Sequence, residues 1–118
     1  MSRVRLADVV TDSISVQQVE ALVASRSAGA VVSFSGDVRD HDHGRDVDLL
    51  EYEGHPTAAA VIAEVAAEVA GRHDVIALAV LHRVGRLEIG EAALVAAVAS
   101  AHRAEAFAAC SDLVDEVK

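Results

Sequence analysis

The sequence predicts an α+β domain with a mainly antiparallel sheet and about three helices, and two observations support this. Short apolar runs with period-two alternation or glycine boundaries, which are typical of strands, recur along the chain. Three other segments carry apolar residues at intervals of three and four, as on the buried face of a helix. In chain order the segments read βαββαβββα, an order that favours antiparallel pairing within one domain over residues 1–118.

The first half of the chain supplies three strands and a helix. Residues 4–10 alternate loosely and predict a strand, and residues 30–38 predict a second strand with a bulge or a close backbone approach near Gly36. Between them we expect a helix, capped by Asp12, Ser13 or Ser15, that ends at Gly29. Its buried face is predicted to hold Val16, Val19, Leu22 and Val23. Residues 47–53 alternate again and are expected to pair with residues 30–38 as a hairpin.

The second half begins with a long helix and ends with another. Pro56 suits the first turn of a helix that is expected to reach about residue 73. Its predicted buried stripe is Ala58, Val61, Ile62, Val65 and Val69. Strands follow at residues 75–84, 86–89 and 92–99, the last assigned as a strand because of Val95 and Val98. Ser100 is a good cap for a final helix over residues 101–118.

Composition excludes several classes of function. The chain has 118 residues, 53% of them hydrophobic, and no apolar run approaches the ~20 residues of a membrane span. A formal net charge of −9 and 3% aromatic residues argue against nucleic-acid and anionic-membrane partners. The single cysteine allows no internal disulfide, and residues 1–10 lack the pattern of a signal peptide, so we expect a cytoplasmic location.

Few residues suggest chemistry by themselves. Cys110 lies in the apolar stripe of the last helix and is interpreted as a small buried hydrophobe. The charged segment 39–46, with His41 and His43, matches no specific zinc pattern and is interpreted as a solvated loop. His102 and Arg103 begin the last helix, where they form either an anion site with the helix N–H groups or an ordinary solvated helix start.

The length of the last helix restricts how its residues can act together. His102 and Lys118 are sixteen residues apart, which is ~24 Å along one helix. Lys118 alone is compatible with a solvated lysine at a helix end. If both residues serve one small ligand, two chains must share the site, and a dimer follows.

Several segments together resemble the MoaE family, the large (catalytic) subunits of molybdopterin synthase. They are GAVVSFSGDVRD, LEYEGHP, HRVGRLEIGEAALVAAVASAHRAEAF and LVDEVK, and the resemblance extends from about Gly29 to Lys118. It implies an α/β-hammerhead fold and a central homodimer within a heterotetramer, with a small ubiquitin-like subunit at each end. The implied activity is transfer of sulfur from that subunit's Gly-Gly thiocarboxylate to cyclic pyranopterin monophosphate, which forms the dithiolene of molybdopterin. No metal or redox cofactor is implied.

The resemblance also implies roles for five residues of this sequence. Lys118 is expected to act in proton transfer or to stabilise the thiocarboxylate, and Phe34 to form the pocket wall. Arg39 is expected to contact the pterin or its phosphate, and His102 and Arg103 to bind phosphate from the neighbouring chain. The family continues past Lys118 into a Pro-aromatic-Lys segment with a second pocket lysine, so we expect a missing tail. A non-catalytic subunit that binds a ubiquitin-like partner or an anionic metabolite, and an anion-binding sensor domain, are the alternatives.

Overall fold

The structure is a computed structural model that describes residues 2–39, 41–42, 45–46, 49–52 and 56–117, with side chains described in 2–39 and 56–117. Its elements are β1 (Val4–Val10), α1 (Val16–Val23), β2 (Ala30–Asp37), β3 (His41–Asp42), β4 (Arg45–Asp46), β5 (Leu49–Tyr52), α2 (Ala58–Arg72), β6 (Ala77–Arg83), β7 (Gly85–Glu88), β8 (Ala92–Ser100) and α3 (Arg103–Val117).

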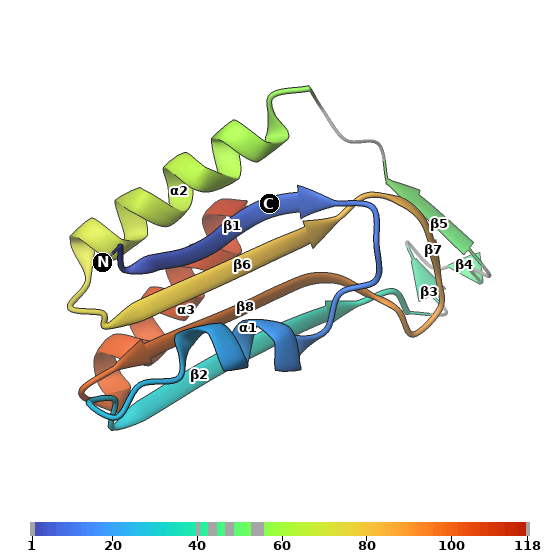
Figure 1. Ribbon diagram of the computed structural model, residues 1–118. Helices are drawn as coiled ribbons and strands as arrows, with labels where there is room; N and C mark the ends of the chain where they lie inside the picture. The colour runs from blue at the N-terminus through green and yellow to red at the C-terminus, as the bar shows by residue number, and fades with distance from the viewer. Residues whose placement is uncertain (1, 40, 43–44, 47–48, 53–55, 118) are drawn as a thin grey trace.

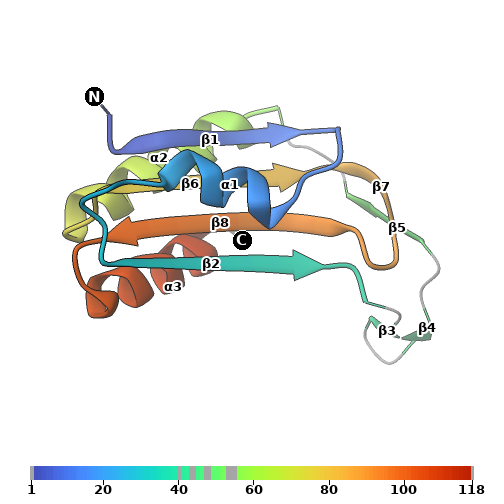
Figure 2. The ribbon, with the colours of Figure 1, turned by 60° about the horizontal axis from the view of Figure 1, so that its bottom comes forward.

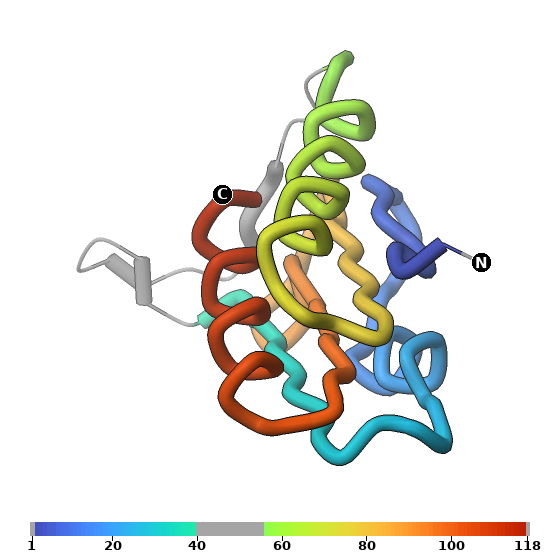
Figure 3. Tube along the Cα trace, turned by 90° about the vertical axis from the view of Figure 1, so that its left-hand side faces the viewer, coloured from blue at the N-terminus to red at the C-terminus, as the bar shows by residue number. Residues whose placement is uncertain are grey.

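A four-stranded sheet in the order β1-β6-β8-β2 forms the centre of the molecule. β1 pairs with β6 in parallel, whereas β6 with β8 and β8 with β2 are antiparallel. Helices α2 and α3 cover one face of this sheet and α1 covers the other (Figures 1 and 3). The smaller pairs β3-β4 and β5-β7 lie beyond one end of the sheet (Figure 2). The prediction of an α+β fold with a mainly antiparallel sheet and three helices is therefore confirmed.

Alternating side chains of the central strands form two separate cores. Leu78 and Val80 of β6 pack with α2 and α3, whereas Ala77 and Ala79 of the same strand pack with α1. Strand β8 follows the same rule and is buried from Ala93 to Ser100. A strand covered on both faces needs apolar residues at every position. This requirement explains why an alanine-rich segment forms a central strand and not the helix that alanine favours.

Helices α1 and α2 each expose a residue that the sequence pattern placed inside. Leu22 of α1 is 38% exposed and Val61 of α2 is 51% exposed. The buried stripe of α2 is shifted by one position and uses alanines where the helix lies close to the sheet; it consists of Ile62, Ala66, Val69 and Ala70. Small side chains permit that close approach.

Helix boundaries also differ from the expected ones. Helix α1 begins after Ser15, whose backbone N–H donates to Gln18 Oε1 at 2.8 Å, and it ends well before Gly29. Thr57 is the N-cap of α2, so Pro56 precedes the helix. Ser100 does not cap α3, because β8 continues through Ser100 and leaves its side chain buried.

The expected hairpin between residues 30–38 and 47–53 is wrong. β5 pairs with β7 instead, and the partner of β2 is β8. The bulge near Gly36 is confirmed by a shift in the β2-β8 register between Gly36 and Asp37. Residues 41–42 and 45–46 pair as two short strands, so this stretch is not simply a loop.

Gly29 lies where the backbone before β2 passes the backbone after β8. A Cβ atom there would lie 2.2 Å from the carbonyl oxygen of Ala101. We expect Gly29→Ala to lower the free energy of unfolding by about 3 kcal/mol, since rigid backbone must move to relieve the overlap. Urea unfolding followed by circular dichroism measures this change.

Gly71→Ala is the matched control for Gly29→Ala. Gly71 is in α2, and a Cβ atom there would meet nothing within 4 Å. Alanine favours a helix over glycine, so we expect the control to unfold at equal or higher urea concentration than the native chain. Equal stability of the Gly29→Ala and Gly71→Ala variants would contradict the close approach at Gly29.

Candidate active site

A row of four aligned residues crosses the sheet under the end of α3. The strand registers align Val9 of β1 with His82 of β6, His82 with Leu94 of β8, and Leu94 with Gly36 of β2. Leu94 packs in the core that also contains residues of α2 and α3, so the row faces these helices. His82 is the one polar side chain of the row. The row therefore presents a single imidazole on an otherwise apolar floor.

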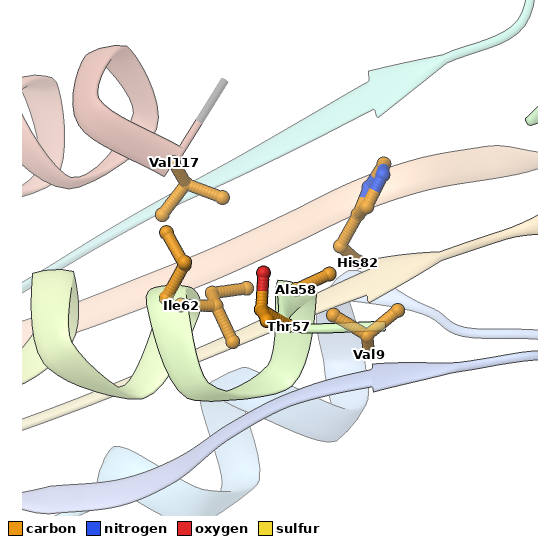
Figure 4. Close-up of a pocket in the computed structure, with 7 residues that line it drawn as sticks. Val9, Thr57, Ala58, Ile62, His82 and Val117 are labelled. Carbon is orange, nitrogen blue, oxygen red and sulfur yellow. The ribbon is translucent and has the colours of Figure 1, made fainter. Parts of the chain in front are cut away.

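Two adjoining cavities lie over this row. The larger, of about 480 Å³, is lined by Phe34, Gly36, Asp37, His82, Ala93, Leu94 and Val117. The smaller, of about 240 Å³, is lined by Val9, Thr57, Ala58, Val61, Ile62, His82 and Val117 (Figure 4). His82 and Val117 border both cavities. Together the two cavities extend from β2 to β1 beneath the end of α3 and the start of α2.

The imidazole of His82 is held in one orientation. Its Nδ1 lies 2.8 Å from the carbonyl oxygen of Ala93, on the neighbouring strand. A carbonyl oxygen only accepts, so the hydrogen of this bond is on Nδ1. The neutral ring then has Nε2 as its basic nitrogen. In Figure 4 the ring rises from β6 on the side of the sheet that carries α2 and α3.

Phe34, to which the resemblance gave the role of a pocket wall, lines the larger cavity. The side chain is 37% exposed, and its ring lies against the backbone of Gly36. A Cβ atom on Gly36 would lie 3.0 Å from Cε2 of this ring. Glycine at this position therefore leaves room for the Phe34 ring.

Arg39 is exposed and follows the end of β2, two residues after Asp37 of the cavity wall. The residue before it is fixed by the turn between β7 and β8. The Val38 N–H donates to the Glu91 carbonyl at 2.9 Å, and the Val38 carbonyl accepts from Gly90 N–H at 2.8 Å. This anchoring holds the start of the segment that carries Arg39 at the rim of the larger cavity.

The position of α3 relative to the cavities is fixed by charged contacts with α2. Arg72 pairs with Glu116, and this hydrogen bond raises the pKa of the Arg72 guanidinium. His73 Nε2 lies 2.7 Å from Asp112 Oδ2. The contacts join the end of α2 to the last turns of α3, the part of α3 that carries Val117.

His102 and Arg103 lie far from both cavities. They are exposed at the start of α3, next to the point where Ser100 of β8 pairs with Ala30 of β2. Val117 is at the other end of the same helix. Within one chain the structure brings Phe34 and the start of the Arg39 segment to the cavity, and it leaves His102 and Arg103 at the opposite end of the sheet. Lys118 and the side chains of His41 and His43 are outside the described residues.

Cys110 is a buried core residue, as its position in the helical stripe predicted. Its side chain is 4% exposed and packs in the core between the sheet and the two long helices. Burial raises the pKa of the Cys110 thiol. A thiol that resists ionisation in an apolar core is a poor nucleophile.

His82 and Asp37 are the cavity residues to which sequence reasoning gave no role. A signal was available, because His82 follows the apolar run 77–81 and falls on the same face as Leu78 and Val80. Its significance depended on which strands lie beside it, and the alternation of one strand does not contain that information.

Within the described part of the chain, no helix is long and apolar enough to span a membrane. The same residues contain no group of three or more histidine, cysteine, aspartate or glutamate side chains placed to hold a metal ion.

The fold and the cavity together define a small α+β protein with a ligand-sized cavity where strand ends meet helix ends. Comparison with known proteins identifies its family. Residues 9–118 match the family model described as MoaE protein, and the chain belongs to this family.

Relatives and solved structures agree with this assignment. The chain is 39% identical over 108 residues to the molybdopterin synthase catalytic subunit of Pyrococcus abyssi, covering 91% of this chain and 73% of the relative. It is 41% identical over 104 residues to the molybdopterin synthase catalytic subunit of Pseudomonas aeruginosa. This match covers 86% of this chain and 69% of that relative. The crystal structure of molybdopterin synthase from Staphylococcus aureus superposes with a TM-score of 0.86 at 28% identity, covering 99% of this chain and 84% of that one.

Proposed function

We propose that this chain is the catalytic subunit of a molybdopterin synthase. It transfers sulfur from the C-terminal thiocarboxylate of a small ubiquitin-like subunit to cyclic pyranopterin monophosphate and so forms the dithiolene of molybdopterin. The family match over residues 9–118 is the observation that carries this proposal. We also propose that residues 1–118 act as one domain and that the protein works in the cytoplasm.

The cavity over the His82 row is the proposed reaction site. Val117 borders both of its parts, and Lys118 is the next residue in the chain. In this proposal Lys118 stabilises the thiocarboxylate or transfers a proton, Phe34 forms the wall, and Arg39 contacts the pterin or its phosphate. Both substrates are anionic while the chain carries a net charge of −9, so binding requires cations gathered locally.

A second copy of the chain completes the proposed site. His102 and Arg103 are at the far end of α3, ~22 Å from Val117 along a fifteen-residue helix. A twofold axis crossing α3 near its middle would place the start of one α3 beside the end of the other. Each site would then combine Lys118 and Arg39 of one protomer with two phosphate-binding residues of its partner.

The face formed by β2 and α3 is the surface that we propose for this dimer. Phe107 of α3 is 60% exposed and borders a shallow groove with Phe34 of β2. β2 is an edge strand of the four-stranded sheet, and α3 runs alongside it (Figure 2). Exposed aromatic side chains beside a free strand edge are suited to a protein interface.

Phe107→Ser tests the proposed interface. Loss of one buried aromatic side chain costs roughly 2 kcal/mol, and a twofold dimer loses two of them, so we expect the dissociation constant of the dimer to rise roughly 1000-fold. Sedimentation velocity over a dilution series measures this change. Leu22→Ser, on α1 at the opposite face of the sheet, is the control and should leave the dimer unchanged. Equal dissociation constants for the two variants would place the interface elsewhere.

The proposed synthase also requires a small partner subunit, which donates the sulfur. One chain in the complex of subunits 1 and 2 of the molybdopterin-converting factor from Helicobacter pylori shares this fold, with a TM-score of 0.74 at 14% identity. We propose that the present chain likewise binds a small subunit, whose extended Gly-Gly tail enters the cavity between β2 and the end of α3.

Reconstitution tests the proposed function directly. The protein is mixed with a thiocarboxylated small subunit and cyclic pyranopterin monophosphate, and molybdopterin is assayed by fluorescence after oxidation. Product formation is the expected result. Binding of the small subunit without any product would instead favour a non-catalytic binding subunit, and absence of both binding and product would reject the proposed function.

A further inference from the structure

We propose that Arg83 and Glu91 are positioning residues of this site, whose ion pair holds the backbone in front of Arg39 and so sets the affinity for cyclic pyranopterin monophosphate. The inference rests on the proposed function, in which Arg39 contacts the pterin or its phosphate, and it adds two residues that act through Arg39. It is carried by a continuous set of hydrogen bonds from β6, through the turn between β7 and β8, to the end of β2.

The Arg83–Glu91 ion pair joins the end of β6 to the turn between β7 and β8 and is largely shielded from water. The Arg83 side chain is 13% exposed and the Glu91 side chain is 32% exposed. Arg83 Nη1 donates to Glu91 Oε2, and Nη2 donates to the carbonyl oxygen of Arg86 in β7 at 3.4 Å. One guanidinium therefore contacts both the turn and the strand that leads into it. A charged hydrogen bond with little access to water contributes more than an exposed ion pair does.

Glu91 also closes the turn between β7 and β8. Its Oε1 accepts a hydrogen bond of 2.8 Å from the Glu88 N–H, and its own N–H donates to the Glu88 carbonyl at 3.0 Å. The hydrogen bonds from the Glu88 N–H and from Arg83 lower the pKa of the Glu91 carboxyl, so it is ionised at neutral pH. Gly90 within the turn has a φ of 89°, which glycine adopts without steric cost. The glycine permits the turn, and the Glu91 carboxylate holds it.

The closed turn binds Val38 through both of its backbone groups. The Val38 N–H donates to the Glu91 carbonyl at 2.9 Å, and the Val38 carbonyl accepts from the Gly90 N–H at 2.8 Å. The Val38 side chain is buried with two residues of the neighbouring strands, Leu87 and Ala93. Arg39 is the next residue in the chain. A displaced turn would therefore move the backbone from which the Arg39 side chain reaches the larger cavity.

A fixed backbone in front of Arg39 favours substrate binding, because less conformational freedom is lost when its guanidinium meets the substrate. Arg39 is exposed, and ordering an exposed arginine has a cost in entropy. Hydrogen bonds from a planar guanidinium to an oxygen anion are directional, so they weaken when the arginine backbone shifts. Both groups that Arg39 is proposed to contact belong to cyclic pyranopterin monophosphate. Loss of the ion pair should therefore weaken the binding of this substrate and not that of the small subunit.

Glu91→Ala tests this inference, with Glu20→Ala as its matched control. Glu20 is also a carboxylate that accepts a hydrogen bond, of 2.9 Å from Ser33 Oγ, but it lies in α1, on the opposite face of the sheet (Figure 3). The dissociation constant for cyclic pyranopterin monophosphate is measured by calorimetry, and KM and kcat are measured by molybdopterin formation. We expect Glu91→Ala to raise this dissociation constant and the corresponding KM about tenfold. The KM for the small subunit and kcat should change little, and Glu20→Ala should match the native protein.

Combination with Arg39→Ala separates positioning from a merely structural role. If Glu91 acts through Arg39, then Glu91→Ala causes no further loss of affinity once Arg39→Ala has removed the guanidinium. A general loosening of the site would instead multiply the two effects. Full multiplication in the double variant, or native affinity in either single variant, would overturn the inference and leave sulfur transfer as the proposed function. A native protein that neither binds cyclic pyranopterin monophosphate nor forms product would reject the function itself.

Glu91→Gln covers the case in which Glu91→Ala does not fold. Its amide oxygen can accept one of the two hydrogen bonds that the carboxylate accepts, so we expect the dissociation constant to rise only about threefold. Amide hydrogen exchange at the Val38 and Gly90 N–H groups should be faster than in the native protein, while exchange at Val98 in the centre of the sheet should not change. Native exchange at Val38 and Gly90, together with native affinity, would overturn the inference.

Discussion

Replacement of Lys118 by alanine is expected to reduce molybdopterin formation by at least about 100-fold, because the reaction loses the cation proposed to face the thiocarboxylate. Lys118 is the one lysine of the sequence, and Val117 before it borders both cavities. Single-turnover assays with a preformed thiocarboxylate measure the chemical step apart from sulfur supply. Binding of the small subunit is followed in parallel by calorimetry.

Lys118→Arg distinguishes the two roles proposed for Lys118. Arginine keeps the positive charge but stays protonated, so it preserves electrostatic stabilisation and removes proton transfer. Activity close to native in Lys118→Arg would assign an electrostatic role, and activity as low as in Lys118→Ala would assign proton transfer. Native activity in Lys118→Ala would remove this residue from the mechanism.

Mixed dimers are expected to recover activity that neither parent variant has. Chains with Lys118→Ala are mixed with chains carrying both His102→Ala and Arg103→Ala, after reversible dissociation. Each mixed dimer then contains one site with all substitutions and one site with none. Half of the dimers are mixed and half of their sites are intact, so random assortment predicts about one quarter of native activity.

The control for mixed dimers places all three substitutions in the same chain. Mixing that chain with Lys118→Ala chains leaves every site without Lys118, and we expect no recovery. Recovery in the first mixture and none in the second would establish a site shared between protomers. Failure of both mixtures, in dimers verified by mass spectrometry, would contradict the shared site and the assignment of His102 and Arg103 to it.

Local patterns predicted the elements well and their partners poorly. β1, and β8 apart from Ser100, occur where alternation and β-branched residues indicated, and the bulge at Gly36 follows from a glycine inside a strand. The pairing of β5 with β7 was missed because a neighbour in sequence is only the most frequent neighbour in space. The exposed side of α2 was misjudged because alanines at 66 and 70 carry little hydrophobic signal yet permit the closest packing.

The candidate site was predictable where it depended on one segment. Phe34 was assigned to a pocket wall through the family resemblance, and its side chain lines the larger cavity, while its role in substrate binding stays a prediction. The separation of His102 from the end of α3 followed from helix geometry alone. His82 could not be assigned a role from the sequence, because its importance arises from β1, β8 and β2 lying in register beside it. Registers between distant strands are set by the whole fold.

The strand order β1-β6-β8-β2 has a consequence for synthesis on the ribosome. The two outer strands are made first and do not touch each other, whereas the two inner strands that join them come last. A nascent chain that has emerged as far as residue 76 contains the two edge strands, β1 and β2. It still lacks the two central strands, β6 and β8. The sheet cannot assemble until translation has passed Ser100, and until then the apolar strand segments are open to chaperones.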